Sequence, residues 1–439
     1  MSNALVSSVV NALNFHSGEP GAAIHAGSRD RHPCEFSPRE WDRSIGVLDR
    51  SGLTLPFYAR MLAAGDSGRF LPHTLAALEQ RRSDNQKRMR CMLHVFGEAV
   101  QVLQHAGVQF VCVKGFSLFP EFLEEPWQRH QIDFDLLIAP GDGLRAQAAL
   151  EEIGYKLTGV AGDGERRMRI PVKRALSHDA YLYSPQEGGA IELHSGFWEA
   201  GAEEFPLTCP EDAFDQAQMC TLDSVSFLRL SQPHAFLYQV LHVFRHFLGS
   251  WARPLWVYEI ANYIRRHADN VEHWREVATL VSADARLTEA ASLVLLTANE
   301  LFACPIPASL EKVCALPDDD SIRLWVHLYA RRWILADMPG NKLNLLLQRH
   351  YFPDGRIWRR YLANRLAPRR GRPVLCEGID AHVARSLKYR AANLSYKGSR
   401  VWHHLRAGAG FAAARVVWGI HLRLSQGAHA SSGLSRSES

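Results

Sequence analysis

The stretch Ile132-Asp133-Phe134-Asp135-Leu136-Leu137-Ile138 decides the fold that the sequence predicts. Side chains at i and i+2 of a strand point to the same face, so Asp133 and Asp135 project together. Phe134 and Leu136 then face the core. Two adjacent carboxylates repel each other unless a cation lies between them, and Mg²⁺ favours such oxygen ligands. The pattern predicts a strand with a metal-binding face, although an Asp-x-Asp pair also occurs by chance on surface strands.

Other short elements surround this strand in the sequence. Residues 108–113 form a β-branched and aromatic run bounded by glycines, and residues 190–194 return from a turn rich in Pro and Gly. These runs, with weaker ones nearby, predict strands at 108–113, 132–138, 155–158, 180–184 and 190–194, and helices at 116–127 and 143–153, the second capped by Asp142. They describe a compact α/β unit.

Helical patterns flank this unit on both sides. Ser37-Pro38-Arg39-Glu40 is a capping box that begins a helical region, and Gly107 is a plausible end for it. The predicted fold class is α+β, with a small mixed-sheet core between helical regions. The expected organisation is disorder at 1–36, helices at 37–106, the α/β core at 107–205, helices at 206–335, a basic helical segment at 336–425 and a disordered tail at 426–439.

Two further groups could complete a site with the aspartates. Lys114 and Gly115 end the strand at 108–113 and open a predicted helix, an arrangement that exposes backbone N–H groups to a phosphate. Ser117 could donate a hydrogen bond to the same phosphate, or it could simply start the helix. Glu192 supplies a third carboxylate on an alternating strand.

Composition places the chain among ordinary folded proteins. Its apolar runs are far shorter than the roughly 18 residues that a membrane helix needs, so no transmembrane segment is predicted. The N-terminus lacks the pattern of a secretory signal, which leads us to expect a cytoplasmic protein. The eight cysteines are scattered without a C-x-x-C pair and are expected to be reduced thiols.

Charge is distributed unevenly along the chain. The net charge is +4, yet residues 340–439 contain 18 Lys and Arg against 4 Asp and Glu, which leaves −10 for residues 1–339. Such asymmetry suggests an anionic partner for the C-terminal segment, whether nucleic acid, a membrane surface or an acidic protein. A solvated Arg-rich helix is the alternative.

Taken together, these motifs resemble a known family. The resemblance of the chain to this family extends over roughly residues 40–335. It rests on Val113-Lys114-Gly115, Arg129, Asp133-Phe134-Asp135-Leu136-Leu137 and Ile191-Glu192-Leu193-His194. The set is similar to the bacterial uncharacterised nucleotidyltransferase family of the DNA-polymerase-β-like superfamily. The resemblance implies that Gly115 lies at the phosphate-binding turn and that Asp133, Asp135 and Glu192 bind Mg²⁺ or Mn²⁺. It also implies transfer of a nucleoside monophosphate from a nucleoside triphosphate to a hydroxyl acceptor, with release of pyrophosphate.

The sequence departs from the family pattern near the phosphate turn. Lys114-Gly115-Phe116 replaces the usual pair of small residues, and the 18-residue step from Gly115 to Asp133 is longer than usual. Lys114 and Arg129 could compensate by binding phosphate. Otherwise Lys114 is a solvated lysine and Arg129 a structural ion-pair partner. His194 could support the metal site or be a packed core histidine.

Three functions remain open at this point. The first is a nucleotidyltransferase that acts on a small molecule, peptide or protein. The second is an inactive nucleotide- or partner-binding module of the same fold. The third is an RNA-directed enzyme that uses the basic C-terminal segment, for which strong salt dependence of RNA binding would be the mark.

Neutralising either Asp133 or Asp135 is expected to abolish metal-dependent nucleotide binding and leave the fold intact.

Overall fold

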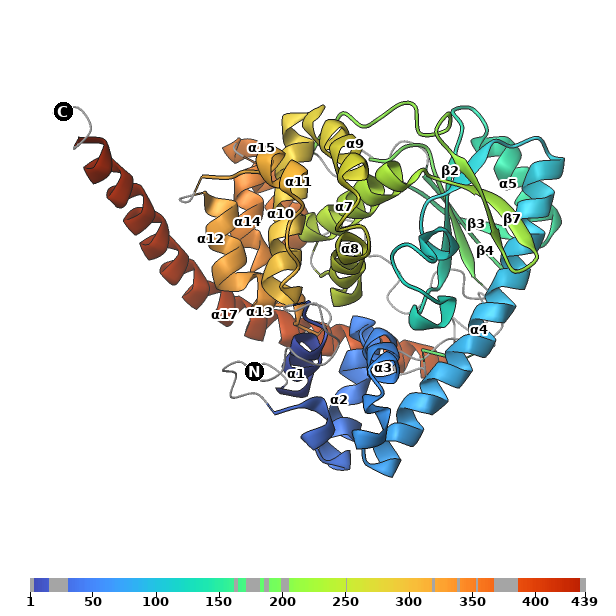
Figure 1. The fold of residues 1–439 in the computed structure, drawn as a ribbon, viewed down its shortest axis with the longest axis horizontal. Helices are drawn as coiled ribbons and strands as arrows, with labels where there is room; N and C mark the ends of the chain where they lie inside the picture. Colours follow the sequence, from blue (N-terminus) through green and yellow to red (C-terminus); the bar gives the residue numbers. More distant parts are fainter. Residues whose placement is uncertain are drawn as a thin grey trace.

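The protein combines one mixed sheet with a larger set of helices (Figure 1). The structure is a computed structural model, and it describes residues 4–15, 31–161, 165–170, 182–184, 189–198, 205–249, 251–317, 320–337, 340–352, 354–366 and 386–434. The predicted α+β class is confirmed.

Seven strands form the sheet in the order β3-β4-β5-β2-β1-β7-β6. Their bounds are β1 Phe110–Cys112, β2 Asp133–Ile138, β3 Lys156–Ala161, β4 Glu165–Arg169, β5 Ala190–His194, β6 Gln218–Leu222 and β7 Val225–Arg229. The pairs β2–β5 and β1–β7 are parallel, and the other neighbours are antiparallel. Strands β2 and β5 therefore lie side by side near the middle of the sheet.

One face of the sheet is covered by helices α4 (Pro72–His105) and α5 (Gly143–Glu152). Phe134 of β2 points to this face and packs against Phe96 of α4, with ring centroids 5.2 Å apart. Gly189, which precedes β5, lies so close to the Phe134 ring that a Cβ atom there would be 2.4 Å from it. Glycine at this position therefore allows the phenylalanine to reach the core.

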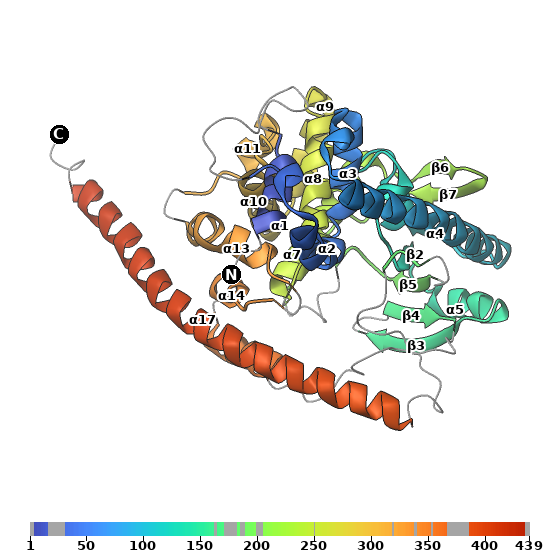
Figure 2. The same ribbon diagram turned by 90° about the horizontal axis from the view of Figure 1, so that it is seen from below.

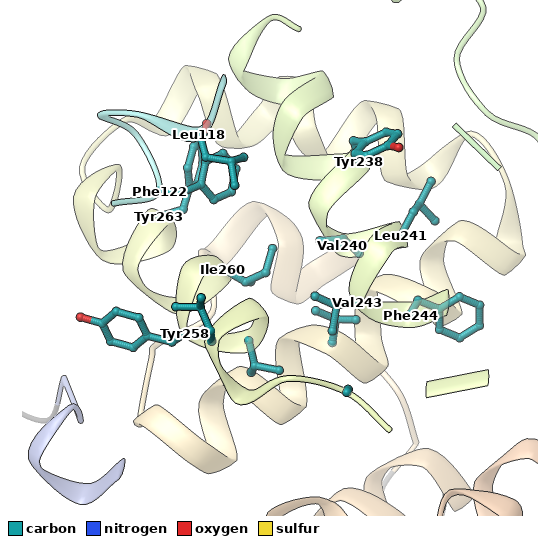
Figure 3. Packing of buried hydrophobic residues seen from close by; sticks show 14 of the residues in the cluster. Leu118, Phe122, Tyr238, Val240, Leu241, Val243, Phe244, Tyr258, Ile260 and Tyr263 are labelled. Carbon is teal, nitrogen blue, oxygen red and sulfur yellow. The ribbon is translucent and has the colours of Figure 1, made fainter. Parts of the chain in front are cut away.

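The opposite face of the sheet looks toward helices α7 (Gln232–Leu248) and α8 (Pro254–Arg266). The η4 turn (Gly115–Leu118) and the loop after it join the two parts. Phe122 of this loop packs on Tyr263 of α8, with ring centroids 4.3 Å apart (Figure 3). Asn262 of α8 also donates a hydrogen bond to the Phe122 carbonyl at 2.8 Å. The sheet and the helices are therefore held together by direct packing.

The remaining helices continue one hydrophobic core that runs from Leu5 to Trp418. They are α2 Pro38–Ser51, α3 Thr54–Ala63, α9 Val271–Ser282, α10 Ala285–Phe302, α11 Ala308–Val313, α12 Ser321–Trp325, the π-helical turn η6 Val326–Ala330, α13 Arg331–Ile334, α14 Asn344–Tyr351, α15 Gly355–Leu366 and α17 Leu387–Leu434, with short 3-10 turns η2 Pro33–Glu35, η3 Asp66–Arg69 and η5 Pro126–Gln128. The capping box at Ser37 and the helix end at Gly107 are confirmed. Figure 2 shows α17 running along one side of the body and beyond it.

The prediction of disorder over residues 1–36 is wrong where the structure describes them. Helix α1 (Ala4–Ala12) buries Leu5, Val9 and Val10, and residues 33–35 form η2. The helix is held partly by Arg331, whose guanidinium donates to the Ser7 carbonyl and the Asn11 side chain. A helix stabilised by a residue more than 300 positions away has no signal in its own sequence that would predict it. Residues 1–3 and 16–30 lie outside the described residues.

Three predicted elements near the core also differ from the structure. The helix expected at 116–127 is replaced by two short 3-10 turns, because Pro120 lacks the N–H group that a continuing helix needs. Residues 182–184 form a turn rather than the strand expected at 180–184, of which 180 and 181 lie outside the described residues. Asp142 does not cap α5; its carboxylate accepts a hydrogen bond from Gln109 N at 2.9 Å and pairs with Arg145.

Two further differences concern residues after 205. The region expected to be wholly helical begins with the β6–β7 hairpin, which lies at the edge of the sheet with Met219 65% exposed. Phe227 of β7 is buried, but Met219 and Leu228 place apolar side chains on the exposed face of the hairpin, so its sequence lacks the clear apolar alternation that predicts strands. At the other end, α17 continues through residues 426–434, where a disordered tail was expected, and residues 435–439 lie outside the described part.

Candidate active site

The three predicted carboxylates lie on the same face of two neighbouring strands. In the parallel pairing of β2 and β5, Asp135 is directly opposite Glu192, and Asp133 is opposite Ala190. Residues paired in this way point to the same side of a sheet. The face is the one that looks toward α7 and α8, away from the phenylalanine core. The expected arrangement of carboxylates on one sheet face is therefore present.

Asp135 lies at the centre of the site and is almost completely buried, with 2% of its surface exposed. Its Oδ1 is 2.6 Å from Lys114 Nζ and 3.0 Å from His194 Nε2. Burial acts to raise the pKa of Asp135, but Lys114 and then His194 hold that pKa below its ordinary value. The carboxylate is consequently ionised and firmly positioned.

A group of possible metal ligands forms around Asp135. One ligand atom from each of Asp135, Glu192 and His194 lies within 4.8 Å of the other two. Burial, and then repulsion by Asp135 and Asp133, raises the pKa of Glu192 to about 7. Arg167 of β4 offsets part of this repulsion, with Nε 3.4 Å from Glu192 Oε1. The group lacks enough positive charge to keep Glu192 fully ionised at neutral pH.

Asp133 points to the same side but is not a member of this three-residue group. Burial, and then the negative charge of Asp135, raises its pKa above the ordinary value. It forms no ion pair with any residue that the structure describes. The structure thus gathers Asp135 and Glu192 with His194, and leaves Asp133 as a fourth, unpaired group beside them.

Lys114 is an inward-facing residue rather than a solvated one, with its side chain 11% exposed. Besides Asp135, its Nζ approaches His242 Nδ1 of α7 at 3.5 Å. Burial acts to lower the pKa of Lys114, yet the charge of Asp135 raises it overall. Lys114 therefore remains a cation that links the strand, the acid and α7.

The turn after β1 differs from the predicted helix start. Gly115 has a φ of +67°, and a Cβ atom there would be 2.9 Å from Gln131 Oε1, so glycine is required twice over. The side chain of Gln131 is buried, and neither its oxygen nor its nitrogen has a hydrogen-bond partner among the described residues. Ser117 donates to the Lys114 carbonyl at 3.3 Å, which gives it a local role in the turn.

Arg129 is committed to a structural ion pair. Its Nε is 2.7 Å from Oε1 of Glu259 on α8, and both side chains are buried. Asn85 of α4 fixes the loop by donating to the Arg129 carbonyl at 3.0 Å. The ion pair that was the alternative for Arg129 is therefore present, and Glu259 offsets its charge. Direct binding of phosphate by Arg129 stays a prediction.

The helical side of the site contributes residues that the sequence did not single out for this purpose. Arg253, just before α8, makes no ion pair with any described residue, and its Nε has no hydrogen-bond partner. Burial, and then Arg129, lowers the pKa of Arg253, whereas Asp133 acts to raise it. Arg253 lies over the ring of Trp256, 5.5 Å from its centroid. No sequence motif marks this arginine, since only the fold brings it near the acids.

His242 and His246 of α7 meet edge to face, with an angle of 77° between their rings. Their ring centroids are 4.9 Å apart, and His246 lies 4.1 Å from the Trp256 ring. Burial, and then Lys114, lowers the pKa of His246 to about 3. Both histidines are therefore neutral aromatic groups next to Lys114.

A mixed-sheet α+β fold with acids converging from adjacent strands is the arrangement expected of a nucleotidyltransferase. The family model described as an uncharacterised nucleotidyltransferase matches residues 37–303. The chain therefore belongs to this nucleotidyltransferase family, a family of transferase enzymes. No curated protein and no solved structure gave a match. Within the described residues, no helix is long and apolar enough to cross a membrane.

Proposed function

We propose that the protein transfers a nucleoside monophosphate from a nucleoside triphosphate to a hydroxyl group of an acceptor. The acceptor hydroxyl loses its proton to solvent, and its oxygen forms a bond to the α-phosphorus. The bond from this phosphorus to the β-phosphate oxygen breaks, and pyrophosphate leaves. The observation that carries the proposal is the convergence of Asp135, Glu192 and His194 within 4.8 Å on one sheet face.

The residues present fit a divalent cation. The raised pKa values of Glu192 and Asp133 show an excess of negative charge in a buried place, which a bound cation would relieve. Carboxylate oxygens suit Mg²⁺ and Mn²⁺, and an imidazole in the set suits Mn²⁺ in particular. Asp135, Glu192 and His194 would hold the first ion. Asp133, which has no ion-pair partner among the described residues, would bind a second one.

Metal ions bound there would orient the triphosphate and lower the pKa of the attacking hydroxyl. The remaining contributions come from the chain itself. Lys114 keeps Asp135 ionised and in place through its 2.6 Å contact. Arg253 has no ion-pair partner among the described residues and is the cation best placed to bind the triphosphate. Arg129 supports the same loop through Glu259.

A second candidate is a nucleotide-binding module without catalysis, and one contact favours it. Lys114 already neutralises the innermost carboxylate, as a site that has lost its metal would show. An intact ion pair of this kind would weaken metal binding without preventing triphosphate from binding to the basic groups.

Metal and nucleotide binding by the intact protein separates these two candidates. Mn²⁺ binding would be followed by electron paramagnetic resonance, and transfer by a screen of labelled triphosphates with cell extract as the source of acceptor. The proposal expects Mn²⁺ to bind the parent and the Glu152→Gln control, which removes an exposed acid of α5. Glu192→Gln should weaken it. Triphosphate binding without Mn²⁺ binding or transfer would establish the inactive module instead.

A further inference from the structure

Among the described residues, helix α17 is buried against the body along one of its faces. Ala414 and Trp418 are buried, and Tyr329 of η6 donates a hydrogen bond to the Ala414 carbonyl at 3.0 Å. The rings of Tyr329 and Trp418 lie 6.1 Å apart. Nearer its start, the helix is held by His403, whose Nε2 is 2.6 Å from the Gly340 carbonyl oxygen. These contacts fix which face of the helix remains in solvent.

The opposite face carries a line of large apolar side chains. At 3.6 residues per turn, Val401, Leu405 and Val416 fall on the side away from Ala414 and Trp418. The exposed apolar residues of the helix are Leu387 at 83%, Leu394 at 72%, Val401 at 60%, Trp402 at 69%, Leu405 at 65%, Val416 at 65%, Val417 at 44%, Ile420 at 53% and Leu424 at 64%. Isolated exposed apolar residues are normal, but a set of this size on one side of a helix marks an interaction surface.

The charges of α17 are all of one sign. Residues 387–434 contain seven Lys and Arg and no Asp or Glu. On the same helical projection, Lys397 and Arg415 lie along one edge of the apolar line and Arg406 lies near the other, while Arg423 lies within the line at its C-terminal end. These four side chains are exposed. An apolar stripe bordered by basic residues and containing a tryptophan is the pattern of a helix that lies in a lipid–water interface.

We propose that the exposed face of α17 binds the surface of a membrane that contains anionic lipids. The apolar line would enter the boundary between headgroups and acyl chains, and the flanking basic side chains would contact the lipid phosphates. Helix α17 extends past the body in Figure 2, and the apolar side chains of this face are exposed. The enzyme would then work next to a membrane, whichever acceptor it uses.

Charge and shape favour this occupant over two others. A second copy of α17 packed on the first would bring like charges together along both edges, with no acid in either helix to pair with them. Nucleic acid would satisfy the arginines but would leave the line of Leu, Val, Ile and Trp without an apolar partner. Only a lipid interface matches both the apolar line and the positive edges.

Flotation of the full-length protein with vesicles tests the proposal. We expect binding to vesicles of phosphatidylcholine mixed with phosphatidylglycerol, and much weaker binding to phosphatidylcholine alone. The triple variant Val401→Ser, Leu405→Ser, Ile420→Ser should lose roughly a hundredfold in affinity. Its matched control is Leu144→Ser, Met219→Ser, Val271→Ser, which removes exposed apolar residues elsewhere and should bind as the parent does.

The charge contribution is tested with a second pair of variants. Lys397→Gln, Arg406→Gln, Arg415→Gln should also lose roughly a hundredfold on anionic vesicles. The control Arg39→Gln, Arg43→Gln, Arg90→Gln removes three exposed arginines from α2 and α4 and should have little effect. Equal vesicle binding by all variants would overturn the proposal. The proposal would also be overturned if the parent formed a concentration-dependent dimer that the apolar triple variant abolished. The same holds if the protein bound RNA but did not bind vesicles.

Discussion

The two faces of strand β2 are built on opposite principles. On one face, Phe134 and Leu136 are buried at 1% and 0% exposure among apolar neighbours. On the other, Asp135 is buried almost as deeply, at 2%, beside Lys114 and His194. Burial of apolar surface stabilises a fold directly, whereas burial of charges costs free energy unless each charge is paired. The first face therefore maintains the sheet, and the second carries the buried charges of the proposed active site.

The comparison also corrects an expectation about the aspartates. Their mutual repulsion suggested that neutralising either one would leave the fold intact. Asp133 has no ion pair among the described residues, so we still expect Asp133→Asn to leave the fold intact. Asp135 does not, because Lys114 and His194 both depend on it. Neighbouring acids on one strand are thus expected to differ in what they contribute to stability.

Asp135→Asn should have the largest effect, and on both function and stability. Loss of a metal ligand removes several kcal/mol of charge stabilisation, so transfer should fall on the order of a thousandfold. Lys114 would also be left without its partner, which typically costs about 3–5 kcal/mol. Urea denaturation and a transfer assay measure the two effects. Asp133→Asn is the matched control and should unfold no more easily than the parent; equal destabilisation by both variants would contradict the ion-pair account.

Phe134→Ala should destabilise the apolar face of β2, while all the residues of the charged face remain unchanged. Truncation of a buried phenylalanine costs about 3–5 kcal/mol, because it loses transfer free energy and leaves a cavity. Urea denaturation would show the loss, while Mn²⁺ affinity of the protein that stays folded should change little. A variant that loses Mn²⁺ at full stability would show that the two faces are not independent.

Arg253→Gln sharpens the comparison from the helical side of the site. This arginine has no ion pair among the described residues to lose, so we expect the free energy of unfolding to change by less than about 1 kcal/mol. Triphosphate binding should weaken by roughly ten- to a hundredfold, because a charge-assisted contact to phosphate is removed. The Arg129→Gln variant is the contrast, since it leaves Glu259 buried and unpaired. If the Arg253→Gln protein were destabilised and its nucleotide affinity unchanged, Arg253 would be a structural residue and not a triphosphate ligand.

The smallest expected effect is the pH dependence of metal binding. Glu192 has a pKa of about 7 in the folded protein, above its ordinary value, so a proton competes with the metal below that pH. Mn²⁺ affinity should rise up to about tenfold per pH unit below pH 7 and level off above it. The metal-free protein should lose stability over the same rise in pH, because a raised carboxyl pKa stabilises the fold only while the group is protonated. Glu192→Gln should remove the pH dependence of both Mn²⁺ affinity and stability. If both dependences persisted in this variant, a group other than Glu192 would be titrating.

Local sequence was sufficient for the features that depend on neighbouring residues. The alternation in 132–138 predicted strand β2 and the shared face of its aspartates, and the capping box at Ser37 predicted the start of α2. These features follow from strand and helix periodicity, which is written into adjacent positions. The same is true of the basic character of α17, although not of which face it exposes.

Tertiary structure decided everything that joins distant parts of the chain. Lys114 and Arg129 looked alike as possible phosphate ligands, yet the fold pairs one with Asp135 and the other with Glu259, 130 residues away. Arg253 carries no motif and becomes a candidate ligand only because the fold brings this residue, just before α8, near Asp133. Helix α1 forms where no local signal predicts it, since Arg331 and the core stabilise it. Periodicity specifies which way a side chain points, whereas its partner is set by long-range packing that no local window of sequence contains.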